Sequence, residues 1–77
     1  MVRLQLSLAD ETFILHLNGS QLIQLFHQQQ AIAFDNPESE LYEFDFQGQR
    51  IGLYTSKVHE KSLVVFFNQQ QVSQLAL

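Results

Sequence analysis

The spacing of apolar residues changes several times along the chain. Over residues 2–8 and 12–17 apolar and polar side chains alternate, which is typical of half-buried β-strands. The segment 9–11, Ala-Asp-Glu, lies between these stretches and supplies turn-forming residues. The beginning of the chain therefore predicts an antiparallel hairpin.

A longer spacing follows the break at residues 18–20. Leu22, Leu25 and Phe26 are spaced as on one face of a helix. An asparagine or serine in the break can cap such a helix by accepting a hydrogen bond from a free backbone N–H. The pattern predicts a helix over 21–33, and a proline-containing turn segment then ends it.

Alternation returns in the second half of the chain. Residues 41–46 predict a strand, 47–49 a turn, and 51–54 a further strand. The charged stretch 56–62 predicts a loop. Residues 63–67 are apolar at every position, which favours a strand inside the sheet that is covered on both faces.

The end of the chain resembles its first half. Segment 14–26 aligns with segment 64–76. The identical pairs are Asn18 with Asn68, Gln21 with Gln71, Gln24 with Gln74 and Leu25 with Leu75. The alignment predicts a weak internal repeat of strand, cap and helix, in which Asn68 caps a short second helix. A shared bias toward glutamine and leucine is the alternative explanation.

The predicted order is β-β-α-β-β-β-α over one domain, residues 1–77. This is an α+β fold with a small antiparallel sheet and two helices on one face. A core of this size supplies only a few kcal/mol of net stability. The aromatic residues of strand 41–46 and the apolar strand 63–67 offer more surface than two short helices cover, and this predicts a homodimer.

Composition narrows the cellular setting. The chain has no cysteine, which excludes disulfides, thiolate metal sites and cysteine nucleophiles, and fits a reducing compartment. The N-terminus alternates and does not form the apolar block of a signal peptide. The longest apolar run has five residues, 63–67, too few to span a membrane. We expect a cytoplasmic protein that does not bind membranes.

Charge is sparse and mostly negative. Four basic residues face eight acidic ones, for a net charge of -4, and glutamine supplies much of the remaining polarity. Binding to phosphate backbones depends on lysine and arginine. We therefore expect no direct contact with DNA or RNA.

The chain shows no motif of a known reaction. Its three histidines, His16, His27 and His59, are scattered, and it has no G-x-S-x-G elbow for serine catalysis. A turn that leads into a helix N-terminus at 18–20 is the one candidate anion site. We expect no enzymatic activity, no metal and no cofactor.

The most distinctive segment is 35–45, which is acidic and contains no basic residue. The candidate partner-binding residues there are Asp35, Glu38, Glu40, Tyr42, Glu43 and Asp45. A solvated outer face of a strand explains them; alternatively, they form an acidic, aromatic-edged surface that docks on a basic partner protein. A protein-interaction module is the predicted function. The alternatives are an inhibitor, of the antitoxin or phage type, of a basic nucleic-acid-binding surface, and a small-ligand or anion-binding domain.

Overall fold

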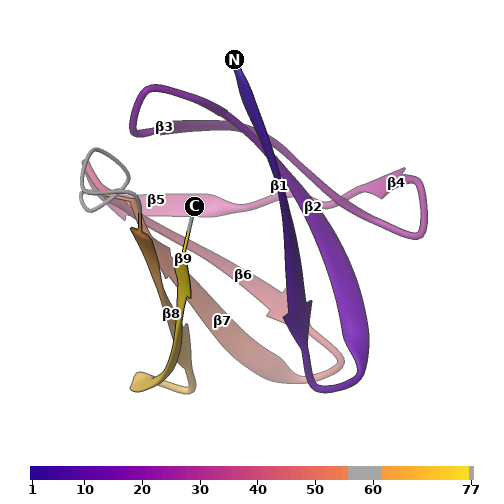
Figure 1. Cartoon of the computed structure of the whole chain (residues 1–77). Helices are drawn as coiled ribbons and strands as arrows, with labels where there is room; N and C mark the ends of the chain where they lie inside the picture. The colour runs from indigo at the N-terminus through magenta and orange to yellow at the C-terminus, as the bar shows by residue number, and fades with distance from the viewer. Residues whose placement is uncertain (56–61, 77) are drawn as a thin grey trace.

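Two antiparallel β-sheets make up the fold of residues 1–55 and 62–76, the residues described by a computed structural model (Figure 1). The first sheet contains, in order, β1 (Val2–Leu8), β2 (Glu11–Asn18), β3 (Gln21–His27) and β4 (Gln30–Ala31). The second contains, in order, β5 (Asp35–Glu38), β6 (Leu41–Phe46), β7 (Gln49–Tyr54), β8 (Ser62–Phe67) and β9 (Gln70–Ala76). None of these described residues is helical, so none of them forms a helix that could cross a membrane.

The α+β prediction is wrong, because both predicted helices are strands. Segment 21–33 contains β3, a two-residue turn and β4. The end of the chain forms β9, which pairs antiparallel with β8. The glutamine-rich tail is thus an edge strand of the second sheet.

A β-bulge explains the helix-like spacing in β3. Leu22 pairs with Leu17 and Gln24 pairs with His16, so Ile23 has no residue opposite it. An extra residue of this kind shifts the alternation of inward-facing and outward-facing side chains by one position. Leu22 and Leu25 therefore both point into the core, although they are three residues apart.

The same irregularity occurs in β9. Phe66 pairs with Gln71 and Val65 pairs with Ser73, which leaves Val72 without a partner opposite it. Val72 is 49% exposed and Ile23 is 39% exposed, so both extra residues lie toward solvent. In β3 the inserted residue gives the two core positions Leu22 and Leu25 the spacing of a helix, whereas in β9 the inserted residue is itself the apolar Val72.

The strands predicted from alternation and from the apolar run 63–67 are confirmed. β1 and β2 form the predicted hairpin, and β6, β7 and β8 correspond to the predicted strands 41–46, 51–54 and 63–67. The predicted loop 56–62 ends at Ser62, the first residue of β8. Its residues 56–61 lie outside the described part of the chain.

Most hairpins of the described residues have two-residue loops. In four of them both loop residues have a positive φ angle. These loops are Ala9-Asp10, Gln28-Gln29, Gln47-Gly48 and Asn68-Gln69. Loops of this conformation match the twist of the strands that they join, although asparagine and glycine adopt it with less strain than glutamine. Short loops thus set the register on both sides of each turn.

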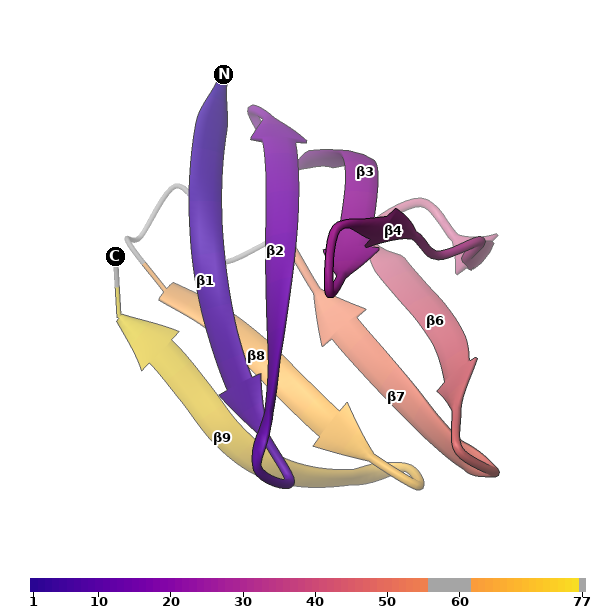
Figure 2. The same cartoon turned by 90° about the vertical axis from the view of Figure 1, so that its right-hand side faces the viewer.

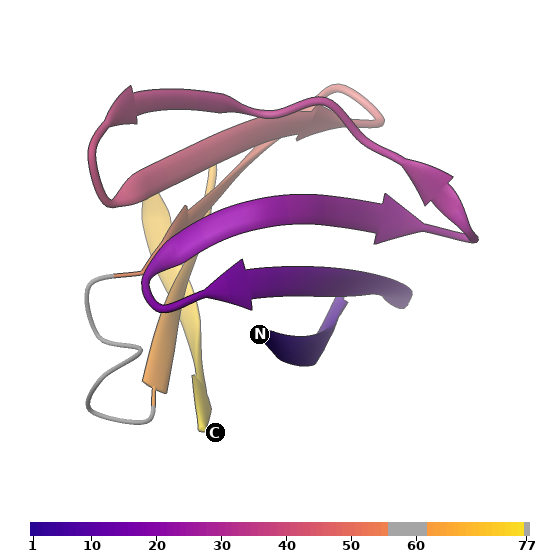
Figure 3. The same ribbon diagram turned by 90° about the horizontal axis from the view of Figure 1, so that it is seen from above.

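The two sheets pack face to face and their strands cross obliquely (Figure 2). The connection between β4 and β5 carries the chain from the first sheet to the second (Figure 3). The buried core takes six side chains from each sheet: Leu6, Phe13, Leu15, Leu17, Leu22 and Leu25 from the first, and Tyr42, Phe44, Ile51, Leu53, Leu63 and Val65 from the second. Phe13 joins the layers, since its ring centroid lies 5.4 Å from that of Phe44 and 5.0 Å from that of Phe46.

Strand β8 is covered on one face, not on both as predicted. Leu63 and Val65 are fully buried against the first sheet. Val64 and Phe66 point to the other side and are only half-buried. The outer face of the second sheet therefore carries apolar side chains that no other element of the described structure covers.

The two aligned segments 14–26 and 64–76 are both hairpins with a bulge in the second strand. The helical half of the predicted repeat is therefore wrong. The alignment also places Asn68, a turn residue, on Asn18, the last residue of β2. The turns of the two segments thus differ by one position, and an internal repeat stays a prediction.

Candidate partner-binding surface

The outer face of the second sheet is built by cross-strand neighbours. Residues directly opposite each other in an antiparallel pair lie on the same face. Glu43 on β6 is opposite Gly52 on β7, which is opposite Phe66 on β8. Asp45 is opposite Arg50 in the same β6–β7 ladder. An acidic edge and an apolar strip are thus placed side by side.

A second apolar row adjoins the first. Leu41, Tyr54 and Val64 face one another across β6, β7 and β8. All three side chains are half-buried, as is Phe66. Together these four residues form the apolar strip of the outer face, and Leu41 and Phe66 are the two that lie against Gly52.

Three carboxylates converge on Arg50. Its Nη2 atom lies 2.7 Å from Oδ2 of Asp35 and 3.5 Å from Oε1 of Glu43, and its Nη1 atom lies 3.3 Å from Oδ2 of Asp45. Asp35 arrives from β5, because it pairs with Glu43 on β6. These four side chains form the Arg50 cluster.

The surroundings of Arg50 favour its charged form. The hydrogen bond to Asp35 raises the pKa of the Arg50 guanidinium, and Asp45 and Glu43 act in the same direction, while desolvation opposes them. Three carboxylates against one guanidinium leave a net charge of -2. The side chains of Asp35 and Asp45 are 69% and 74% exposed, so they remain accessible to a partner.

A hollow of about 260 Å³ opens where the acidic edge meets the apolar strip. Its lining residues are Leu41, Glu43, Arg50, Gly52, Phe66 and Gln69. Gly52 has no side chain, so the space between Leu41 and Phe66 stays unfilled. The hollow combines an apolar floor with one acidic and one basic wall.

The structure brings three of the six predicted site residues together. Asp35, Glu43 and Asp45 belong to the Arg50 cluster. Glu38 and Glu40 are exposed at the β5–β6 turn, away from that cluster. The backbone carbonyl of Glu40 accepts hydrogen bonds from the N–H and the hydroxyl of Thr55, at 2.9 and 3.1 Å.

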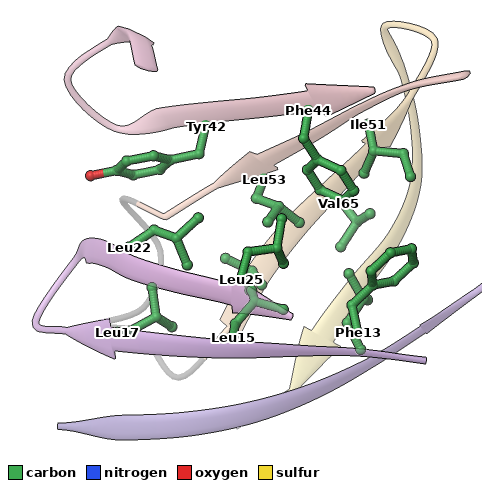
Figure 4. Close-up of a cluster of buried hydrophobic side chains, with 12 residues drawn as sticks. Phe13, Leu15, Leu17, Leu22, Leu25, Tyr42, Phe44, Ile51, Leu53 and Val65 are labelled. Atoms are coloured by element: carbon green, nitrogen blue, oxygen red, sulfur yellow. The ribbon is translucent and has the colours of Figure 1, made fainter. Parts of the chain in front are cut away.

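Tyr42 does not reach the surface. Its side chain is 4% exposed, and it points into the space between the sheets with Phe44 (Figure 4). Its ring packs against that of Phe34 at a centroid distance of 5.6 Å. The aromatic edge expected beside the acidic residues is therefore part of the core. Phe66 and Tyr54, both half-buried, supply the aromatic rings on this face instead.

Arg50, Gly52 and Phe66 were missed by sequence reasoning. Arg50 and Gly52 lie on one face of the predicted strand 51–54 once that strand is extended back to Gln49. A glycine inside an apolar strand signals a bulge or a close approach by another group. That signal was available at Gly52, while the place of Phe66 follows only from the β7–β8 register.

The other candidate groups have structural partners. His27 Nε2 lies 3.2 Å from Glu11 Oε2, and its ring packs against Phe46 and Phe13. His16 Nδ1 lies 3.2 Å from Gln24 Oε1, and His59 lies outside the described residues. Within residues 1–55 and 62–76 no three His, Asp or Glu side chains are grouped to hold a metal ion.

The candidate anion site at 18–20 loses its geometric basis. This segment is the end of β2 and a turn into β3, in which Gly19 has a φ angle of 62°. An anion site of the predicted kind needs the converging N–H groups of a helix N-terminus. A strand-to-strand turn does not supply them.

No protein-family model, no curated protein and no solved structure matches the chain.

Proposed function

We propose that this protein is a non-enzymatic interaction module that binds a partner protein with a basic surface. The binding surface is the Arg50 cluster together with the apolar strip beside it. The single observation that carries the proposal is the convergence of Asp35, Glu43 and Asp45 on one arginine, which leaves exposed negative charge at the border of an apolar hollow.

Charge and apolar surface serve different steps of such an association. Exposed carboxylates attract a basic partner over distances of about 10 Å at moderate ionic strength and raise the association rate. Contacts over the half-buried Leu41 and Phe66 then supply affinity through burial of apolar area. The overall charge of -4 supports the same direction of attraction.

A cytoplasmic location is part of the proposal, and the lack of cysteine in the chain supports it. In the same proposal the chain does not contact nucleic acid directly. Its few basic residues include Arg50, which three carboxylates already neutralise.

The test compares capture of host proteins by three forms of the chain. The full-length protein, the variant D35N/D45N and the control variant D10N/E11Q are immobilised and exposed to lysate of the natural host. Both variants lose two negative charges, but Asp10 lies in the β1–β2 loop and Glu11 at the start of β2, outside the second sheet. We expect a small set of proteins with basic surfaces to be retained by the wild type and by D10N/E11Q and to be lost from D35N/D45N.

Salt provides an independent check of the same proposal. Retention of the true partner falls steeply between low and physiological ionic strength, because exposed charges are screened. Equal retention of every captured protein by all three forms would show that the Arg50 cluster is not the docking surface. If the captured partner is a nucleic-acid-binding protein, competition with its nucleic acid decides whether this chain acts as an inhibitor.

A further inference from the structure

The hollow at Gly52 is not required by the fold. A Cβ atom added to Gly52 would meet Cβ of Phe66 at 3.4 Å and Cδ1 of Leu41 at 3.6 Å, which are ordinary van der Waals distances. Gly52 also lies within regular strand β7, outside the left-handed backbone region that favours glycine. An alanine would therefore fit, and glycine in a strand interior lowers stability.

Gly52 thus weakens β7 without a structural need, and its missing side chain leaves a space on the outer face for a group from another molecule. The space here is bordered by Leu41 and Phe66 and opens toward the Arg50 cluster. An apolar side chain from outside can enter it and cover the two flanking side chains. The negative charge beside it favours a cation on the same incoming segment.

The spacing of the two features defines the incoming segment. Gly52 and Arg50 lie two residues apart on one face of β7, as do Glu43 and Asp45 on β6. Two residues of an extended strand span about 6.8 Å, and side chains at this interval point to the same side. An extended peptide with an apolar residue and a lysine or arginine two positions apart matches this geometry.

We infer that the Gly52 hollow is the specificity pocket of the docking surface, and that it receives an apolar side chain from an extended, basic segment of the partner protein. The inference rests on the proposed function and narrows it to one class of ligand, with the pattern apolar-x-Lys/Arg in either direction. A second copy of this chain docked on this face by twofold symmetry does not fit, because two Arg50 clusters of charge -2 would then face each other.

The experiment selects ligands without knowledge of the partner. A phage-displayed library of random twelve-residue peptides is panned on the immobilised full chain. Enriched peptides are synthesised with a fluorescein label, and their binding is measured by fluorescence polarisation. The proteins compared are the wild type, G52A, G52V, D35N/D45N and D10N/E11Q. Melting curves from circular dichroism establish that each variant is folded.

The inference predicts enriched peptides with an apolar residue two positions from a lysine or arginine. Their affinity falls by about tenfold or more in G52V, which fills the hollow, and by less in G52A, which adds one methyl group. D35N/D45N weakens binding and reduces its salt dependence, whereas D10N/E11Q binds like the wild type. Should G52V fail to fold, G52A carries the same comparison.

Other outcomes separate the two proposals. Peptides that lose affinity in D35N/D45N but bind G52V and G52A like the wild type would overturn the pocket and leave the acidic docking surface in place. Peptides that bind the Gly52 variants and D35N/D45N as tightly as the wild type also overturn the pocket. A selection that enriches no peptide has the same consequence. The capture of a folded partner by the host-lysate comparison then decides the proposed function independently.

Discussion

At the scale of single residues, Arg50 has the largest electrostatic role on the outer face. Its guanidinium contacts Asp35, Glu43 and Asp45, which come from two different strands. Without it, three carboxylates would lie close together with no cation between them. Like charges at this separation repel, so Arg50 stabilises the β5–β6–β7 region as well as setting its net charge.

We expect Arg50→Gln to lower the midpoint of thermal unfolding by a few degrees at low salt. The loss shrinks as salt is added, since the carboxylates are largely exposed and their repulsion is screened. Arg50→Lys retains the charge but not the forked geometry, so we expect its unfolding midpoint to lie between those of the wild type and Arg50→Gln. Differential scanning calorimetry at low and high salt measures the effect.

Arg3→Gln is the matched control, because it removes one positive charge from an exposed position of β1. It changes the overall charge by the same amount as Arg50→Gln. Equal losses in the two variants would mean that the effect comes from overall charge and not from the Arg50 cluster.

At the scale of elements, the bulges in β3 and β9 are the features that the sequence pattern conceals. In a strand without a bulge, inserting or deleting one residue moves every later side chain to the opposite face of the sheet. In β3 the extra residue is Ile23, so removing it restores regular pairing and leaves Leu22 and Leu25 facing the core. This strand should therefore tolerate a deletion that others do not.

We expect deletion of Ile23 to leave a cooperatively folded protein that has lost about 1 kcal/mol, a typical cost for a single change. Deletion of Ile14 from β2 is the control. It cannot keep both Phe13 and Leu15 in the core, and both are fully buried. Thermal melts followed by circular dichroism distinguish the two, and loss of cooperative melting in both would show that the bulge is essential.

The loop Gln28-Gln29 gives a second prediction at this scale. Both residues have positive φ angles, 51° and 67°, which cost a residue other than glycine about 1 kcal/mol or more. Replacing them with Asn-Gly should raise the unfolding free energy by about 1 kcal/mol, and the melting midpoint by about 4–8 °C.

The β5–β6 loop, Ser39-Glu40, is the control because neither of its residues has a positive φ angle. The same Asn-Gly replacement there should give no gain. A similar gain at both loops would show that backbone strain at Gln28-Gln29 is not the cause.

These local rules define what the sequence could predict. Alternation identified β1, β2, β6 and β7 because both sheets bury one face, and a short turn after Phe46 sets Asp45 opposite Arg50. The arrival of Asp35 beside Arg50 depends on β5, which joins the sheet through Glu43. Pattern analysis could not anticipate this, because β5 has no apolar alternation and contains Pro37.

The helices were predicted wrongly for a related reason. The i, i+3 spacing of Leu22 and Leu25 is shared by a helix and by a bulged strand, and no local property of the segment separates the two. The buried position of Tyr42 likewise depends on a second sheet, because a single sheet with two helices would leave part of its aromatic face open.

At the scale of the whole molecule, the homodimer stays a prediction, but its basis changes. Tyr42 and Phe44 are buried between the sheets and offer no surface to a second subunit. β9 is an edge strand of the second sheet, and its residues include neither a charge nor a proline that would protect an edge from pairing. Antiparallel pairing of β9 with its copy would form a twofold dimer.

We expect light scattering at high micromolar concentration to give twice the mass of one chain, and Val72→Lys to reduce it to a monomer. Val72 is the exposed extra residue of β9, so a lysine there protects the edge without disturbing the core. Ile23→Lys is the matched control, an exposed bulge residue in β3 inside the first sheet. A single-chain mass for the wild type at that concentration would rule the dimer out.

The pairing of each strand with its neighbours in sequence also has a kinetic consequence. Closing a two-residue loop costs little chain entropy, so the hairpins that have such loops can form and dissolve within microseconds. Contacts between distant parts of the chain lie in the core between the two sheets, where for example Phe13 meets Phe44 and Phe46. We expect the slow event in folding to be the docking of the two sheets, which expels water from between them. We therefore expect the chain to fold faster than β-sandwiches whose strands pair with distant partners in sequence.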